Sequence, residues 1–328
     1  MDKRIYLEQL REKYEIACRA EGKSSKTVSG YNQIICALIR YMVETGLSTL
    51  LSDFSIDTVR SYILYLEQRP KFQGHPFTPP QDNGLARESI RDHVRTLKAF
   101  STWLYTEGYT RKNMLKTLKL PKPDQLLFKP LTFEEKIRIF EAIKQDTLTG
   151  HRNRAFIEVL LDTGLRVSGI TGADIQDLNV QDGSLKIMGK GRKERFVPIG
   201  IQTLATLVDY MNHERQKYVK TDCTALFISV KGEPLSTNAV KLLFTRLAKK
   251  SGVYRLHAHL CRHTFAIDYL MNGGDIYSLK EILGHSSLTM VERYLHFTQA
   301  QITTRHRQFS PMDKFKEQNQ THEPDSHA

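Results

Sequence analysis

Cysteine is scarce in this chain, with four residues among 328, and tryptophan occurs only once. The cysteines form no C-x-x-C pair and no spacing that is typical of metal ligands. They are Cys18, Cys36, Cys223 and Cys261. We therefore expect no disulfide framework, and we interpret all four as small buried side chains in a reducing cytoplasm.

Long hydrophobic runs are missing as well. No stretch of about 18 apolar residues occurs, so the sequence predicts no membrane span. The first residues, MDKRIYLEQLREKYEIAC, lack the apolar segment of a signal peptide. We expect a cytoplasmic protein that has no membrane partner.

Acidic residues are outnumbered, because 36 Asp and Glu stand against 48 Lys and Arg and leave a net charge of +12. A protein this basic commonly has a polyanionic partner, and nucleic acid is the first candidate. Solubility alone explains the charge equally well. The positions of the basic residues must therefore decide between the two explanations.

The N-terminal part contains four amphipathic segments, which predict a small helical bundle over residues 1–120. The segments lie within residues 1–22, 24–46, 55–66 and 89–107. Ile16 is assigned to the apolar face of the first segment. Residues 69–89 are rich in Pro and Gly and predict a loop. Residues 121–130, PKPDQLLFKP, interrupt any helix and predict a linker.

The part that follows, residues 131–312, mixes helices with short β-type runs. Thr132 and Glu135 have the spacing of a capping box. The sequence predicts a hairpin at 184–199 around a Gly-Lys-Gly turn, a strand at 225–230, and helices at 152–161, 238–249, 259–271, 276–283 and from Thr289 through Tyr294. The fold class is thus mainly α with a small sheet (α+β), and residues 313–328 are expected to form a polar, disordered tail.

The fourth predicted helix carries a basic stripe with positions at i, i+4, i+8 and i+11. A charged run on a helix is often only a solvated face. A stripe of one sign, without acids at those positions, favours contact with a phosphate backbone. The candidates for DNA contact are Arg87, Arg91, Arg95 and Lys98 in this stripe, with Arg192 and Lys193 beside the predicted hairpin turn.

Residues 256–297 hold the densest group of chemically active side chains. Cutting a DNA strand without a metal ion needs cations on the phosphate, a nucleophile and proton carriers. Arg166 and Arg262 can each donate two hydrogen bonds to phosphate oxygens. Tyr294 can be the nucleophile, and His259 can be its base, because a free tyrosine has a pKa of about 10.

Two further residues complete this chemistry. Lys190, between two glycines at the hairpin tip, can protonate the leaving 5′-oxygen, and His285 can donate to a phosphate oxygen. Structural explanations stay open for each residue: Lys190 as a solvated turn residue, Tyr294 as a core ring, and Arg166 as a helix cap.

The neighbouring histidines are interpreted as supporting residues. His257 and His263 flank the H-x-x-R motif, and we expect neither to act directly in catalysis. No Asp, Glu or Cys nearby completes a ligand set, so the sequence predicts no metal and no cofactor.

Five separated motifs follow one another along the chain: TGLR, the GKG hairpin, HLCRHTFA, LGH and a tyrosine nine residues later. In this order they resemble the tyrosine recombinase/integrase family, from about Ser24 to the helix after Tyr294. The resemblance implies a SAM-like core-binding bundle at 1–120 and a catalytic domain at 131–312. It implies as catalytic residues Arg166, Lys190, His259, Arg262, His285 and Tyr294.

The resemblance also implies a reaction. In the family, the tyrosine attacks a phosphate to give a 3′-phosphotyrosyl link, and strands are exchanged through a Holliday junction without ATP or metal. The implied partners are double-stranded DNA with a specific recombination site, three further protomers in a tetramer, and accessory proteins. A C-terminal segment, here residues 299–315, docks on the neighbouring protomer.

The chain departs from the family pattern at several positions. Gly169 stands where the family usually has an acidic residue, and Met114 stands where it commonly has proline. We expect no arm-binding domain, and the Pro70–Gly84 segment favours a mobile-element integrase over a chromosome-resolving enzyme. Two alternatives remain: a type IB topoisomerase-like enzyme, and a DNA-binding regulator weakened by Gly169.

Overall fold

The computed structural model describes residues 4–70, 79, 81, 84–122, 129–144, 147–188, 194–284, 287–292, 294, 306 and 310–320. The chain divides into two compact units, Met1–Leu127 and Phe128–Ala328, and each has its own hydrophobic core. Among the described residues, no helix has both the length and the apolar character needed to cross a membrane.

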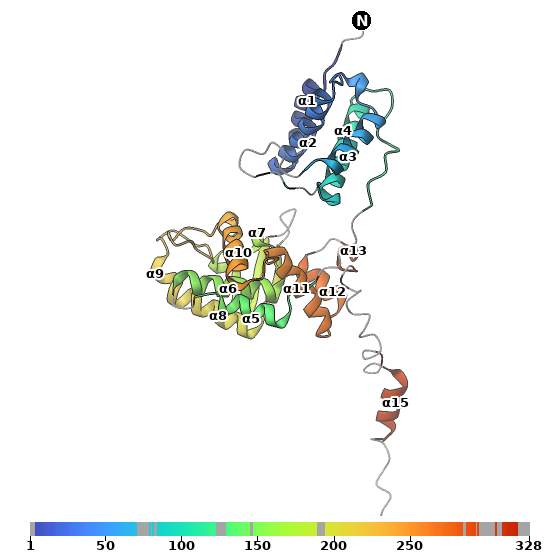
Figure 1. Ribbon diagram of the computed structural model, residues 1–328. Helices are drawn as coiled ribbons and strands as arrows, with labels where there is room; N and C mark the ends of the chain where they lie inside the picture. Colours follow the sequence, from blue (N-terminus) through green and yellow to red (C-terminus); the bar gives the residue numbers. More distant parts are fainter. Residues whose placement is uncertain are drawn as a thin grey trace, which may run out of the picture. The chain divides into compact units, whose positions relative to one another are not determined.

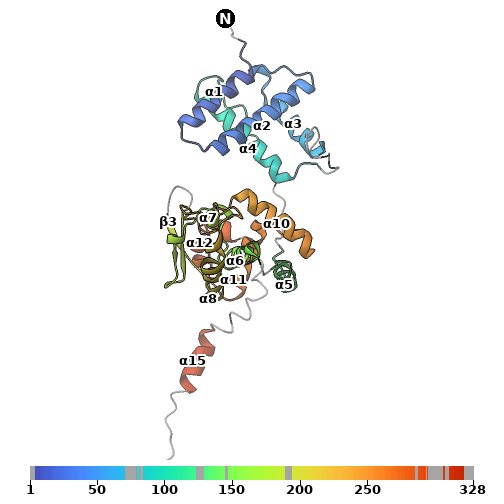
Figure 2. The ribbon, with the colours of Figure 1, turned by 90° about the vertical axis from the view of Figure 1, so that its left-hand side faces the viewer.

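The first unit is a bundle of four helices that lie side by side (Figure 1, Figure 2). They are α1 (Leu7–Ala20), α2 (Ser25–Glu44), α3 (Ile56–Gln68) and α4 (Arg87–Thr106), with a short 3-10 turn η1 (Leu51–Asp53). Helices α2 and α3 are capped at their N-termini, since Ser24 and Ser55 each accept a hydrogen bond from the backbone N–H three residues ahead. The predicted apolar face of α4 is buried from Ile90 to Leu104.

Two predicted core positions in the first unit are wrong. Ile16 is 67% exposed, because the buried stripe of α1 runs through Tyr14 and Cys18, and a rotation of about 100° per residue puts Ile16 on the opposite side. Cys36 is exposed for the same reason, since its neighbour Ile35 occupies the buried face of α2.

The second unit is mainly helical, with a small antiparallel sheet at one edge (Figure 2). Its helices are α5 (Phe133–Glu141), α6 (Leu148–Thr163), α7 (Val167–Thr171), α8 (Ile201–Asp209), α9 (Gln216–Tyr218), α10 (Thr237–Ser251), α11 (Ala258–Met271), α12 (Ile276–Leu283), α13 (Thr289–Glu292) and α15 (Pro311–Gln320), with η2 (Ile175–Asp177) and a π-helical turn η3 (Tyr210–Arg215). This confirms the predicted fold class.

Helix α11 is the centre of the second unit. Its residues from Leu260 to Ile267 are all buried, so the helix is covered on every side rather than along one stripe. It packs against α6, which ends at Thr163, and against α12 (Figure 1). Polar side chains of α11 are therefore held in fixed positions by the surrounding core.

The sheet consists of β1 (Leu178–Asn179), β2 (Ser184–Met188) and β3 (Glu194–Pro198) in that order. The predicted hairpin is confirmed, with Ile187 opposite Arg195 in the antiparallel register. Strand β1 was not predicted, because two residues are too short to give a periodic signal.

The strand predicted at residues 225–230 is wrong. This segment makes only isolated bridges, at Ala225 with Asp174 and at Ile228 with Pro234. Its carbonyl groups are taken by buried arginines instead: Arg215 donates to the Ala225 oxygen and Arg152 to the Ile228 oxygen. The apolar run is buried without joining a ladder.

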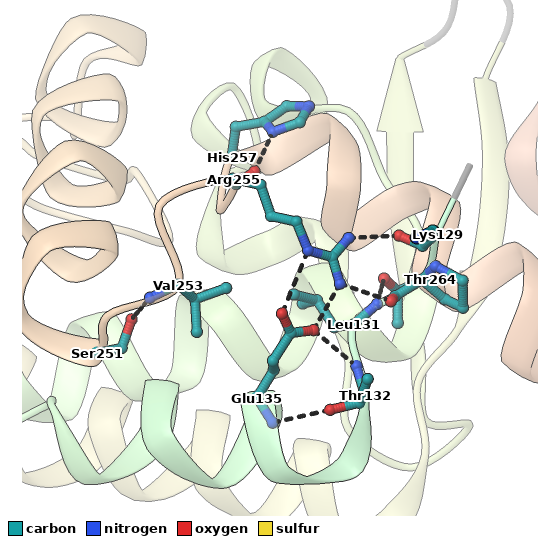
Figure 3. A network of polar contacts seen from close by, with 10 residues as sticks. Lys129, Leu131, Thr132, Glu135, Ser251, Val253, Arg255, His257 and Thr264 are labelled. Atoms are coloured by element: carbon teal, nitrogen blue, oxygen red, sulfur yellow. Dashed lines mark hydrogen bonds and ion pairs between the residues drawn. The ribbon is translucent and has the colours of Figure 1, made fainter. Parts of the chain in front are cut away.

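The start of the second unit is anchored to the approach of α11 (Figure 3). The predicted capping box of Thr132 and Glu135 is confirmed. The guanidinium of Arg255 donates to both Glu135 carboxylate oxygens and to the carbonyl oxygens of Lys129 and Pro130. The backbone N–H of Leu131 donates to the buried Thr264 hydroxyl at 2.9 Å. Residues 129–135 are thus fixed to Arg255, which precedes α11, and through Leu131 to α11 itself.

Several elements differ from the sequence prediction. The helical stretch from Ile201 to Tyr218 was not predicted. Residues 311–320 form α15 rather than a disordered tail, because Pro311 is suited to the first helical position and Ser310 accepts from the Asp313 backbone at 3.4 Å. Helix α13 ends at Glu292, so Tyr294 follows it rather than lying within it.

Candidate active site

Four of the predicted catalytic residues, Arg166, His259, Arg262 and Tyr294, lie among the described residues. Lys190 and His285 lie outside the described residues, as do the predicted DNA-contact residues Arg192 and Lys193. The four described residues come from three segments that are distant in sequence: the turn before α7, the first half of α11, and the turn after α13.

The Arg262 guanidinium is fixed between the ends of two helices. Its Nη1 donates to the carbonyl oxygen of Gly164 at 2.6 Å, and its Nη2 donates to that of Leu283 at 2.8 Å. These carbonyls belong to the C-termini of α6 and α12, where the helix dipole favours a positive charge. Only 2% of Arg262 is exposed, so its position is set by the core.

Both helix ends are made by glycines with a positive φ, which is 60° at Gly164 and 63° at Gly284. A Cβ atom on Gly164 would lie 2.3 Å from Cδ1 of Phe265, which is on α11. Glycine is therefore needed for the left-handed conformation and for the close approach of α6 to α11. Together these two turns bring the carbonyl groups to Arg262.

Tyr294 is enclosed in a small apolar cluster with α11 and α12. Its neighbours there include Phe265, Leu283 and Val291, and only 2% of Tyr294 is exposed. Its hydroxyl lies 2.6 Å from Nδ1 of His263. The direction of this hydrogen bond follows from the tautomer of the histidine. The tyrosine is thus at once a core ring and a hydrogen-bonded hydroxyl close to Arg262.

His263, interpreted from the sequence as a supporting residue, is the histidine that contacts the Tyr294 hydroxyl, a partner that the sequence did not identify. His259 is exposed, and its ring packs edge-on against His263 with 4.3 Å between centroids. The spacing of four residues on one helix could have indicated that the two rings share a face. His257 has a structural role, since Nδ1 lies 2.7 Å from the Arg255 carbonyl oxygen (Figure 3).

Arg166 is exposed at the N-terminal cap of α7. Gly169, one turn later, faces the hairpin: a Cβ atom there would lie 3.1 Å from Cγ2 of Ile187. An acidic side chain at position 169 would thus press against a buried residue of β2. The close packing of α7 on the hairpin gives a physical reason for the missing acid.

The site is strongly electropositive. Burial, followed by the charge of Arg166, lowers the pKa of the Arg262 guanidinium to about 10. Burial and then Arg166 also lower the pKa of Arg195 in β3. Neighbouring arginines without an acidic partner form a site that favours an anion. In the described part of the chain, no three His, Cys, Asp or Glu side chains are grouped as a metal site.

Comparison with known proteins agrees with this arrangement. The phage integrase family matches residues 129–301. Tyrosine recombinase XerC of Bacillus pumilus (strain SAFR-032) is 32% identical over 278 residues, which cover 83% of this chain and 86% of the relative. The chain belongs to the phage integrase family of tyrosine recombinases. It is therefore an enzyme of DNA recombination.

Solved structures show that this tyrosine recombinase shares the integrase fold. The Tn1549 transposon integrase in complex with a circular intermediate DNA is 20% identical with a TM-score of 0.69, over 88% of this chain and 95% of the other. A lambda integrase tetramer bound to a Holliday junction is also 20% identical, with a TM-score of 0.66, over 89% and 78%.

In this recombinase, acidic side chains lie beside the basic stripe of α4. Arg95 forms ion pairs with Glu88 at 2.8 Å and Asp92 at 2.6 Å, and Arg91 Nε lies 3.1 Å from a Glu88 oxygen. Lys98 donates to the carbonyls of Lys116 and Leu118. The premise that acids are absent is wrong, because Glu88 and Asp92 lie one turn from the arginines.

Proposed function

We propose that this recombinase cuts and rejoins DNA at a specific site through a 3′-phosphotyrosyl bond to Tyr294, without metal or ATP. The observation that carries the proposal is the position of Arg262. Its guanidinium is fixed by the Gly164 and Leu283 carbonyls, and the Tyr294 hydroxyl is held by His263 in the same buried region. A fixed cation beside a hydroxyl nucleophile suits attack on a phosphodiester.

In the proposed cleavage step, Arg166 and Arg262 bind the non-bridging oxygens of the phosphate, and His285 donates a further hydrogen bond. The Tyr294 oxygen forms a bond to phosphorus as the bond from phosphorus to the 5′-oxygen breaks. Lys190 gives a proton to the leaving 5′-oxygen. The tyrosine proton passes to a histidine, either His259, as the family resemblance implies, or His263, which contacts the hydroxyl.

Rejoining reverses these steps with a different strand. A 5′-hydroxyl of the partner DNA attacks the phosphotyrosyl bond and releases Tyr294, so the bond energy is retained in the ester. Two such exchanges on paired sites pass through a Holliday junction and need four protomers. The lambda integrase tetramer on a Holliday junction, which has a similar fold, supports this assembly. Residues 299–315 are proposed to dock on the neighbouring protomer.

A conformational step must precede cleavage. With 2% of their surfaces exposed, neither Tyr294 nor Arg262 can contact a phosphate in duplex DNA from the positions described above. We propose that DNA binding or contact between protomers moves the segment after α13, so that the Tyr294 hydroxyl leaves His263 and reaches the phosphate, and Arg262 is uncovered. The structure then represents a state before cleavage, in which the proposed nucleophile is buried.

The proposed biological role is integration or excision of a mobile element, assisted by accessory proteins. The Pro70–Gly84 segment of the sequence favours this role, and a chromosome-resolving recombinase is the alternative. Sequencing of DNA joined covalently to the protein would distinguish them. Cleavage near the ends of a mobile element supports the proposal, and cleavage confined to one chromosomal site contradicts it.

A nicked suicide substrate tests the proposed reaction. The expected result is an SDS-resistant adduct with the wild-type protein and none with Tyr294→Phe, because the phenyl ring has no nucleophilic oxygen. No adduct on any candidate site would contradict the proposal and favour a DNA-binding regulator. An adduct with relaxation of any plasmid, but no recombinant product, would indicate a topoisomerase.

A further inference from the structure

Arg195 lies on the inner face of the hairpin. Side chains alternate between the two faces of a strand, and in β3 Val197 is buried whereas Phe196 is exposed. Arg195 therefore shares the face of Val197 and of its cross-strand partner Ile187, which packs against Gly169 of α7. Strand β2 packs against α7 and strand β3 against α12 (Figure 2).

The guanidinium of Arg195 reaches the end of α12. A Cβ atom on Gly284 would lie 2.6 Å from Nη1 and 2.7 Å from Cζ of Arg195, so the planar group packs on the glycine backbone. The carbonyl just before this glycine, at Leu283, accepts a hydrogen bond from Arg262. Arg195 and Arg262 therefore approach the same helix end from two sides.

The polar groups of Arg195 lack the partners that other buried arginines have. Arg152 and Arg215 donate to carbonyl oxygens, but the buried Nε of Arg195 has no hydrogen-bond partner. No carboxylate of the described residues forms an ion pair with Arg195, and its charged neighbours are Arg166 and Arg262. A partly buried cation beside another cation is unfavourable until an anion joins them.

We propose that Arg195 is a third phosphate ligand of the active site, donating to a non-bridging oxygen of the phosphate that is cleaved. The proposal rests on the proposed function, because it takes that phosphate to lie between Arg166 and Arg262. No described residue accepts a hydrogen bond from the Arg195 Nε, so a phosphate oxygen that binds the guanidinium does not have to replace such a partner. Arg195 then belongs to the catalytic residues, since it touches the substrate.

Two variants and one control test this role. Lys186→Ala is the matched control, because Lys186 is a cation of the same hairpin whose neighbours are Asp177 and Glu194 rather than the phosphate site. Arg195→Ala is expected to slow adduct formation on the suicide substrate by about 100-fold. Arg195→Lys is expected to recover part of the rate, and Lys186→Ala to stay within about threefold of wild type.

A methylphosphonate at the cleaved position separates a phosphate ligand from a structural residue. The methylphosphonate is neutral because one charged non-bridging oxygen is replaced by a methyl group. On this substrate, the cleavage rate of Arg195→Ala is expected to lie within about threefold of the wild-type rate on the same substrate. Equal losses on phosphate and methylphosphonate, or a melting temperature lowered equally in Arg195→Ala and Arg195→Lys, would overturn the proposal.

Binding of phosphate by Arg195 can be measured without DNA and independently of the cleavage reaction. Inorganic phosphate, compared with chloride at equal ionic strength, is expected to raise the melting temperature of wild type and Lys186→Ala more than that of Arg195→Ala. The same rise in all three proteins would overturn the role of Arg195. Absence of the wild-type adduct alone would instead count against the cleavage reaction.

Discussion

At the scale of single residues, Tyr294 combines a buried core ring with the hydroxyl that we propose as the nucleophile. The ring is packed in an apolar cluster, as expected for a core residue, and the hydroxyl is hydrogen-bonded to His263. Burying a tyrosine hydroxyl without a partner is unfavourable, so His263 makes the buried position tenable. Sequence spacing could not reveal this contact, because 31 residues separate the pair.

Chemical modification tests whether the Tyr294 side chain is buried in the absence of DNA. In the absence of DNA, tetranitromethane is expected to nitrate Tyr254 and Tyr277, which are 83% and 67% exposed, at least about tenfold faster than Tyr294. Mass spectrometry of tryptic peptides measures the three rates within one sample. Equal rates at Tyr294 and Tyr254 would mean that the hydroxyl is open to solvent, and the proposed conformational step would be unnecessary.

At the scale of elements, the site depends on where helices end. The C-termini of α6 and α12 supply the carbonyls that hold Arg262, and each end requires a left-handed glycine. Gly164 has an additional constraint, because a Cβ there would meet both Phe265 and Leu283. The glycine of the TGLR motif is thus a packing requirement of the active site.

Two glycine substitutions distinguish the destabilisation caused by backbone strain from that caused by overpacking of the core. Gly252 ends α10 with a φ of 68°, and a Cβ there would meet nothing closer than 3.8 Å. Gly252→Ala is expected to lower the free energy of unfolding by about 1 kcal/mol through backbone strain alone. Gly164→Ala is expected to lose about 1–3 kcal/mol more, because the methyl group overpacks the core. Chemical denaturation measures both, and equal losses would contradict the packing argument.

The same scale shows what the sequence could and could not predict. Helices with clear caps, such as those after Ser55 and Thr132, were predicted with their start correctly placed. The prediction of a strand at 225–230 was wrong, because an apolar run does not reveal whether its carbonyl groups accept hydrogen bonds from a neighbouring strand or from arginine side chains. Helix α15 was missed because its polar composition outweighed the Ser-Pro start signal.

At the scale of the whole molecule, the net charge of +12 agrees with a DNA substrate. The basic side chains of α4 are less available for phosphate contact than the sequence indicated. Arg91 and Arg95 are paired with Glu88 and Asp92 on the same helix. The Arg95 side chain is 45% exposed and its ion pairs are weak, so a phosphate can displace the acids there, whereas only 15% of the Arg91 side chain is exposed. Whether α4 contributes to DNA binding therefore has to be measured.

The salt dependence of binding decides the role of α4. Replacing Arg91 and Arg95 together by Ala is expected to weaken binding to all DNA sequences and to reduce the slope of log K against log salt by about 1–2. The matched control replaces Arg11 and Arg19, which are also paired with glutamates but on α1. An unchanged slope in the Arg91 and Arg95 variant would assign the stripe to solvent.

The hydrogen bonds around Arg255 have a practical consequence for building chimeric recombinases. Lys129, Pro130 and Leu131 are bound by Arg255 and Thr264, so they belong structurally to the second unit. A fusion joined after Leu131 would give these three positions a foreign sequence, whose backbone groups would have to take the same places beside Arg255 and the buried Thr264 hydroxyl, whereas one joined before Lys129 keeps the native segment. Exchange of the first unit between relatives, as a route to new target sites, should therefore place the junction upstream of Lys129.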